Sequence, residues 1–442
     1  MSNISFHLMF PSGMVEIPRL TKRESVMPAQ AGIQGGEVVE ITENLDSRFR
    51  GKDGRGSRLS VGIVQIPRLR AESCLICWLF ALLLLPACAG LPVRGRIGGQ
   101  AIDTRVDAEV ARYYLASYLS GQRNNPALDG RIADTYKNSR NDLPDRAELK
   151  RLSEEFSVDF AAAYLADRII RVPENRRFRE LFEENRRAFS QKRLKLPNGA
   201  ADYEVMFIPT YLYKRLPITG GDFAVPKQAL QRIDLPFHFV ETVEDGAVET
   251  NADIVAAAIG ARAQSDRRLI VISASKSGPE VALALTRLGG AATRHVVAWI
   301  NTVGALQGTP LTDEQLLPEV EDFVGAVNVA GMQSLMTERS RRRFQSFRLP
   351  DHILVVNYFG IPLSGSVSSW ARAGFTPLSK HGPNDGILLL SDMILPGGIT
   401  VAELGLDHFL LDQNLDAATV GLVTAVMRWM GEGPPRVLQV SD

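Results

Sequence analysis

The chain has very few cysteines. There are three in 442 residues, Cys74, Cys77 and Cys88, and all of them lie in or beside one apolar segment. The residues after Cys88 contain none, so disulfide bonds cannot stabilise that part of the chain. Its stability must come from the burial of apolar side chains.

The chain also lacks net charge, because 50 Lys and Arg side chains balance 50 Asp and Glu side chains. No overall field attracts a polyanion, and we expect no nucleic-acid partner. The basic run at residues 339–343 is expected to be a solvated helix end or loop. The sequence has no metal-ligand spacing, dinucleotide fingerprint or phosphate-binding loop, so we expect neither a cofactor nor a metal ion.

The apolar segment at residues 75–87 is too short to span a bilayer comfortably, but its length of about 13 residues suits the core of a signal peptide. It ends in Leu85-Pro86-Ala87-Cys88, which resembles a bacterial lipobox. We therefore expect residues 61–88 to be a signal peptide and Cys88 to be the lipidated first residue of the mature chain. The resemblance implies a lipid-anchored protein of the cell envelope, at the outer membrane and facing the periplasm. A plain secretory signal or an uncleaved anchor is the alternative.

Residues 1–60 show little of a packable pattern and look like translated intergenic repeats. The hexapeptide at residues 15–20 nearly recurs at residues 64–69. A signal peptide belongs at an N-terminus, so we expect residues 1–60 to be an unstructured leader that precedes the true start.

Residues 89–196 are expected to form a helical N-terminal segment. Apolar residues recur at helical spacing from Val106 to Ser117 and again from Leu149 to Tyr164. A third stretch, residues 176–187, mixes both charge signs, as a solvated helix face does.

After Pro197, short β-type runs alternate with helix-compatible stretches. The expected strands are residues 203–209, 237–243, 269–272, 296–300 and 353–358, and the expected helices include 252–263 and 281–288. This alternation favours an α/β fold, with a doubly wound, mostly parallel sheet over residues 197–442. Residues 360–380 mix apolar and flexible residues, as either a lid or an ordinary long loop would.

Residues 269–280 have the pattern of a nucleophile elbow, in which a strand meets a sharp turn and then a helix. The usual pattern is G-x-S-x-G, and here Ser273 and Ser277 occupy the glycine positions around Ser275. Both flanking positions must be small because the turn is strained and its backbone is closely packed. Ser275 is therefore the predicted nucleophile.

The residues from Ser273 to Lys276 also spell S-x-x-K, the signature of penicillin-binding enzymes, in which the serine opens a helix. Pro279 would then fall inside that helix and cost ~3 kcal/mol. In the elbow, Pro279 lies in the first helical turn, where proline is tolerated. The proline favours the elbow and Ser275.

A serine hydroxyl needs a neighbouring base, and in an elbow enzyme the acid and then the histidine follow the serine in the chain. Of the later histidines, His295 and His352 precede expected strands, at the sheet edge away from a site. His381 and His408 remain. Asp385, in a turn-forming cluster, is the expected acid and gives the right order with His408, whereas His381 could line the pocket.

Four segments taken in order resemble the lipase-like branch of the α/β-hydrolases. They are residues 273–278, the GTP-type segment 307–311, the NDG-type segment 383–386 and the DH-type segment 406–408. The resemblance covers roughly residues 200–430. It implies a serine hydrolase with Ser275 as nucleophile, Asp385 as acid and His408 as base. Together with the lipobox, we expect a membrane-tethered enzyme that acts on a small-molecule or lipid ester.

An oxyanion needs two preorganised donors. The backbone N–H of Lys276 is one, and the loop after strand 203–208 should supply the other from Thr210 or Tyr211. The Lys276 side chain is expected to reach solvent. A non-catalytic binding or scaffold lipoprotein with the same fold is the alternative function, because serines stand at both glycine positions.

Overall fold

The computed structural model describes residues 90–138, 143–313, 329–411 and 414–432. All of them belong to one compact unit, Cys74–Asp442. The expectations for the leader, the signal peptide and Cys88 concern residues 1–89 and lie outside the described residues.

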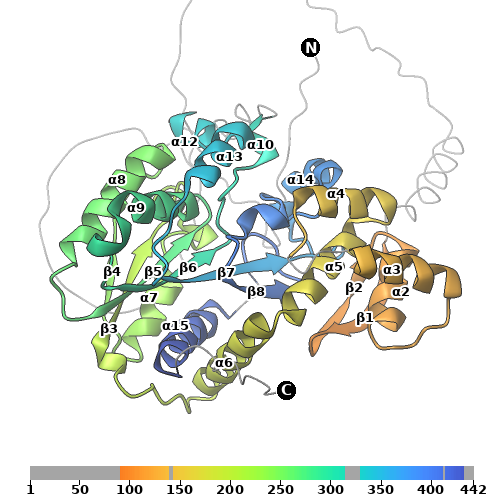
Figure 1. Ribbon diagram of the computed structural model, residues 1–442, viewed down its shortest axis with the longest axis horizontal. Helices are drawn as coiled ribbons and strands as arrows, with labels where there is room; N and C mark the ends of the chain where they lie inside the picture. Colours follow the sequence, from red (N-terminus) through yellow and green to blue (C-terminus); the bar gives the residue numbers. More distant parts are fainter. Residues whose placement is uncertain (1–89, 139–142, 314–328, 412–413, 433–442) are drawn as a thin grey trace, which may run out of the picture. The chain divides into compact units, whose positions relative to one another are not determined.

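A six-stranded parallel sheet forms the centre of this unit (Figure 1). Its order is β4-β3-β5-β6-β7-β8, and each neighbouring pair is parallel. The strands are β3 (Tyr203–Ile208), β4 (Phe237–Phe239), β5 (Arg268–Ala274), β6 (Val296–Thr302), β7 (Leu354–Ile361) and β8 (Ile399–Leu404). The predicted doubly wound fold is confirmed, although β4 is shorter than expected and β8 was not predicted.

Helices cover both faces of the sheet, because successive side chains of a strand point to opposite sides. In β3, Val205 and Phe207 join one apolar core, while Met206 and Ile208 join the other. The first core is covered by α6 (Pro173–Ser190), α7 (Ala224–Gln231) and α15 (Leu415–Glu432), and the second by α8 (Val248–Ala261) and α9 (Ser277–Ala292). Figure 1 shows the two layers on opposite sides of the strands.

The N-terminal segment begins with a β-hairpin rather than a helix. Strands β1 (Leu91–Ile97) and β2 (Gln100–Val106) pair antiparallel around a Gly98-Gly99 turn, where φ is 53° and 86°. Their buried residues are four apart in each strand, Val93 with Ile97 and Ile102 with Val106. A spacing of four is also that of a helix face, so it does not distinguish these strands from a helix. The expectation of a wholly helical segment was wrong here.

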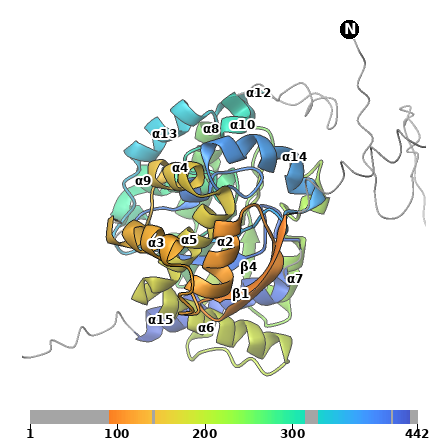
Figure 2. The ribbon, with the colours of Figure 1, turned by 90° about the vertical axis from the view of Figure 1, so that its right-hand side faces the viewer.

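The rest of this segment is helical and faces the viewer in Figure 2. It contains α2 (Glu109–Tyr113), which continues into the π-helical turn η2 (Tyr114–Tyr118), then α3 (Pro126–Asn138), α4 (Arg146–Glu155) and α5 (Val158–Arg171). Asp159 joins α5 to the connection after β7, because its carboxylate accepts hydrogen bonds from the N–H groups of Asp107 (2.7 Å) and Ser364 (2.8 Å). Burial, together with the nearby charge of Asp107, raises the pKa of Asp159 to about 7.

Short helices follow β6 and β7. They are α10 (Pro310–Asp313), α12 (Val329–Gln333), α13 (Thr337–Ser346) and α14 (Ser369–Leu378), and the 3₁₀ turns are η3 (Ala200–Asp202), η4 (Pro217–Thr219), η5 (Ser379–His381) and η6 (Leu390–Met393). The stretch 360–380 therefore holds a helix, α14, that buries Ala371 and Phe375. The basic run 339–343 lies in α13, and its Arg343 is buried rather than solvated. Across the described residues, we find no helix with both the length and the apolar character needed to cross a membrane.

Candidate active site

The turn between β5 and α9 has the strained backbone of a nucleophile elbow. Ser275 has a φ of 52°, in the left-handed region that non-glycine residues rarely adopt. Two backbone hydrogen bonds of 2.9 Å hold it there, from its N–H to the Thr302 carbonyl and from the Ala305 N–H to its own carbonyl. The predicted elbow is therefore formed, and it leaves Ser275 partly exposed.

The structure brings Ser275, His408 and Asp385 together. The Nε2 atom of His408 lies 3.1 Å from Ser275 Oγ, and its Nδ1 atom lies 2.7 Å from Asp385 Oδ2. Asp385 is fully buried and His408 is 9% exposed. With Nδ1–H donating to the carboxylate, Nε2 is left to accept the Ser275 proton. Of the two histidines that the sequence left open, His408 is the one that contacts the serine.

The turn that carries Asp385 is fixed by its own backbone. Asp385 Oδ1 accepts the N–H groups of Ile387 (2.9 Å) and Leu388 (2.7 Å), which leaves Oδ2 for His408. Gly386 has a φ of 93°, and a Cβ there would lie 2.5 Å from the Cβ of Ala371. The Thr309 hydroxyl of the GTP-type segment donates to the Ile387 carbonyl. That segment therefore positions the acid, a role that the motif alone does not reveal.

Both serines at the glycine positions of the motif have hydrogen-bond partners. Ser273 lies within β5 and accepts a 2.9 Å bond from the Trp299 indole N–H. The Ser277 hydroxyl donates to the Ile208 carbonyl (2.7 Å) and accepts from the Ala274 N–H (2.8 Å). Because Ser273 lies within β5 and α9 begins at Ser277, the arrangement required by S-x-x-K, with Ser273 opening a helix, is not formed.

The Lys276 side chain is buried, so the expectation that it reaches solvent was wrong. It is 2% exposed and forms an ion pair with Glu280, one turn further along α9, which is 1% exposed. Burial raises the pKa of Glu280, against the opposing effect of the Lys276 charge. The i,i+4 spacing of the two residues was the signal in the sequence. Among the described residues, none accepts a hydrogen bond from the Lys276 backbone N–H, the predicted oxyanion donor.

The backbone N–H of Thr210, one of the two candidates for the second oxyanion donor, is not free. Its backbone N–H donates to the Gly221 carbonyl at 3.3 Å and so is already engaged. Its side-chain Oγ1 is buried and has no hydrogen-bond partner among the described residues. Tyr211 follows at once, and Leu212 after it donates to the Glu244 carbonyl at 3.0 Å.

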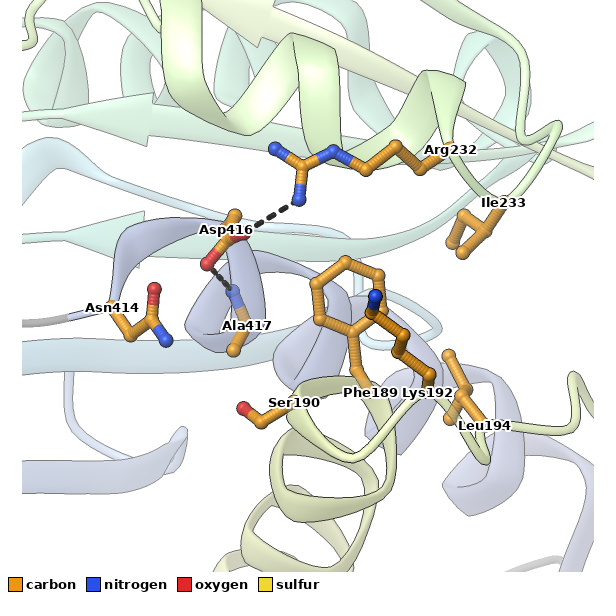
Figure 3. Close-up of a pocket in the computed structure, with 9 residues that line it drawn as sticks. All are labelled: Phe189, Ser190, Lys192, Leu194, Arg232, Ile233, Asn414, Asp416 and Ala417. Carbon is orange, nitrogen blue, oxygen red and sulfur yellow. Dashed lines mark hydrogen bonds and ion pairs between the residues drawn. The ribbon is translucent and has the colours of Figure 1, made fainter.

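In the part of the chain that the structure describes, His, Cys, Asp and Glu side chains form no group of three or more that could hold a metal ion. A cavity of about 460 Å³ lies where α6, α7 and α15 meet (Figure 3). Figure 3 shows Asp416 between Arg232, its partner at 2.8 Å, and the Ala417 N–H. Arg232 and Asp416 pair with each other, and Lys192 is the third charged residue of the lining.

Comparison with known proteins found only distant likenesses. No family model matches the chain, and no curated protein matches it. A metagenomic carboxyl esterase, MGS0156, is 18% identical over 54% of this chain and 78% of its own, with a TM-score of 0.45. The mature Bacillus licheniformis lipase BlEst2 is 19% identical over 54% of this chain and 94% of its own, with a TM-score of 0.42. The phospholipase PlaB from Legionella pneumophila is 14% identical over 43% and 45%, with a TM-score of 0.34. No activity follows from likenesses of this degree.

Replacing Ser277 by the usual glycine should destabilise the protein. Neither Ser277→Gly nor Ser277→Ala can bond the Ile208 carbonyl or the Ala274 N–H, and leaving such groups unpaired costs about 1–3 kcal/mol. Ser277→Thr, which keeps the hydroxyl, is the matched control, although its extra methyl must be accommodated. Urea denaturation measures the free energy of unfolding. A Ser277→Gly protein as stable as wild type would contradict a stabilising role for these bonds.

Proposed function

We propose that this chain is a serine hydrolase that cleaves carboxylic esters through an acyl-enzyme on Ser275. One observation carries the proposal: a continuous hydrogen-bonded path from buried Asp385 through His408 to the hydroxyl of Ser275, at 2.7 Å and 3.1 Å. The left-handed backbone of Ser275 supports it, because that strain presents the hydroxyl at the end of a parallel strand.

The first half of the reaction would form the acyl-enzyme. His408 Nε2 takes the proton of Ser275 Oγ as this oxygen attacks the ester carbonyl. Asp385 stabilises the resulting imidazolium and keeps its orientation. When the tetrahedral intermediate collapses, the carbon–oxygen bond to the leaving alcohol breaks, and His408 returns the proton to that oxygen. In the second half, water takes the place of the serine hydroxyl, and the products are a carboxylic acid and free Ser275.

The negative oxygen of the intermediate would lie at the N-terminus of α9. There the Lys276 N–H has no backbone acceptor among the described residues, and the helix dipole adds to its effect. We assign the second donor to the Thr210 hydroxyl, with Tyr211 as the neighbouring candidate. Thr210 lies two residues beyond Ile208, which pairs in register with Ser273, two residues before Ser275. Adjacent strands are about 4.8 Å apart, so the segment that follows β3 begins next to the elbow, and the buried Thr210 hydroxyl in it has no hydrogen-bond partner among the described residues.

The alternative function, a non-catalytic binding or scaffold lipoprotein, was left open by the serines at the glycine positions. Since the hydroxyls of Ser273 and Ser277 have partners inside the fold, their presence no longer speaks against catalysis. The substrate class is a small-molecule or lipid ester.

Removing any one of the three groups should abolish most of the activity. For Ser275→Ala, His408→Ala and Asp385→Asn we expect kcat on p-nitrophenyl esters to fall by about 10³-fold or more. A fluorophosphonate probe should label wild type and fail to label Ser275→Ala. His381→Ala is the matched control and should keep its activity. A wild-type protein that neither hydrolyses a panel of acyl chain lengths nor reacts with the probe would instead favour the binding protein.

The role of the Thr210 hydroxyl as an oxyanion donor can be tested by two substitutions, one that removes the hydroxyl and one that keeps it. Thr210→Val preserves the shape and removes the donor, so kcat should fall by about 100-fold with little change in KM. Thr210→Ser keeps the hydroxyl and should stay close to wild type. Equal kcat values for the two variants would assign the second donor to Tyr211.

We also propose that the protein is tethered to the cell envelope by a lipid on Cys88, at the outer membrane and facing the periplasm. The support is the lipobox-like sequence at residues 85–88, after an apolar run of signal-peptide length. In a bacterial host given labelled palmitate, wild type should carry the label in the membrane fraction. Cys88→Ala should lose it, whereas Cys77→Ala should keep it. An unlabelled wild-type protein would argue for a plain secretory signal.

A further inference from the structure

A buried charge pair lies at the start of α9, directly after the nucleophile in the chain. Lys276, the residue after Ser275, pairs with Glu280, and both side chains are almost fully buried. A buried ion pair is weak evidence for stability, because desolvation of two charges offsets their attraction and an apolar pair of similar volume is often as good. Stability alone therefore does not account for a lysine at this position.

The pair is the start of a longer hydrogen-bonded path. Glu280 Oε1 accepts from Lys276 and also from Asn251 Nδ2 of α8, at 2.9 Å. The other oxygen, Oε2, has no partner among the described residues, so Glu280 is held through one atom. The Asn251 amide also binds both backbone groups of Val243. Its Nδ2 donates to the Val243 carbonyl (2.9 Å), and its Oδ1 accepts a hydrogen bond from the Val243 N–H (3.1 Å).

The far end of this path is packed against the loop after β3. The Leu212 N–H donates to the carbonyl of Glu244, the residue after Val243, at 3.0 Å. The Tyr213 hydroxyl donates to the carbonyl of Thr242, the residue before Val243, at 3.1 Å. Both contacts lie just beyond Thr210 and Tyr211. The path therefore begins at one proposed oxyanion donor and ends against the segment that supplies the other.

We propose that Lys276, Glu280 and Asn251 are positioning residues that fix the separation of the two sides of the oxyanion hole. This inference rests on the proposed acyl transfer. None of the three side chains touches the substrate. They act by holding the Lys276 backbone and the loop after β3 in one arrangement, so that both donors are in place before negative charge develops on the substrate oxygen.

The decisive variant is the double substitution Lys276→Met with Glu280→Met. It replaces both charges by apolar side chains of similar volume, so its melting temperature should equal or exceed that of wild type. We nevertheless expect kcat to fall by about 10- to 100-fold with little change in KM. A trifluoromethyl ketone forms an oxyanion when the serine attacks it, and its Ki should rise by the same factor. A purely structural role of the pair would leave this Ki unchanged.

Three further variants complete the experiment. Asn251→Ala cuts the path without touching either charge and should lower kcat in the same way, which keeps the test valid if the double variant does not fold. Glu280→Gln keeps an acceptor for both Lys276 and Asn251 but removes the counter-charge of buried Lys276, so it should lower the melting temperature while the folded protein retains most of the activity. Removing an exposed pair of α3, Lys137 and Asp134, should leave kcat unchanged.

The outcomes separate this inference from the function on which it rests. A folded double variant and Asn251→Ala with wild-type kcat and Ki would overturn the positioning role while leaving the hydrolase intact. A wild-type protein without Ser275-dependent ester hydrolysis, measured first, would overturn both.

Discussion

The left-handed backbone of Ser275 is the constraint on which the rest of the site depends. A non-glycine residue in that region costs of the order of 1–3 kcal/mol and persists only where its surroundings determine it. Here the backbone N–H of Ser275 binds Thr302, the last residue of β6, and its carbonyl binds Ala305 in the loop that follows. The Ser277 hydroxyl ties the same turn to the end of β3. Three neighbouring strands thus hold a conformation that the serine would not adopt alone.

A row of polar side chains crosses the sheet from the elbow to the connection that contains Asp385. Ser273, Asn301, Asn357 and Thr400 occupy one register line on β5 to β8. Asn301 Nδ2 donates to Asn357 Oδ1, and Asn357 Nδ2 donates to Thr400 Oγ1, each at 3.3 Å. The same amides bind the backbone of Met393 and Leu395, in the connection between β7 and β8 that also contains Asp385. The hydrogen-bonded part of the row therefore runs from Asn301 to Thr400, and Asn301 Oδ1 has no partner among the described residues.

The sequence was sufficient for five of the six strands of the parallel sheet and for the elbow, because each depends on a local pattern, whereas β8 was not predicted. Ser275 and Asp385 stand in turns with their own chemical signature, and the proline at 279 distinguished two interpretations of one motif. The hairpin at residues 91–106 was missed because its buried residues have the spacing of a helix face. The i,i+4 spacing of Lys276 and Glu280 signalled their ion pair, but the burial of that pair and the engagement of the Thr210 N–H depend on contacts with other segments, around Asn251 and Gly221, that no local pattern reveals.

The serines at the glycine positions show what the elbow requires. Of residues 273, 275 and 277, only Ser275 has a positive φ, so the two flanking positions need small size and not the conformational freedom of glycine. The room comes instead from Gly278, where a Cβ would lie 2.7 Å from Asn301 Oδ1. A serine in place of glycine also restricts the unfolded chain, an effect worth about 0.4–1 kcal/mol at compatible sites. With both hydroxyls bonded inside the fold, an elbow flanked by serines should be stiffer than one flanked by glycines, and stiffness is what a preorganised oxyanion site requires.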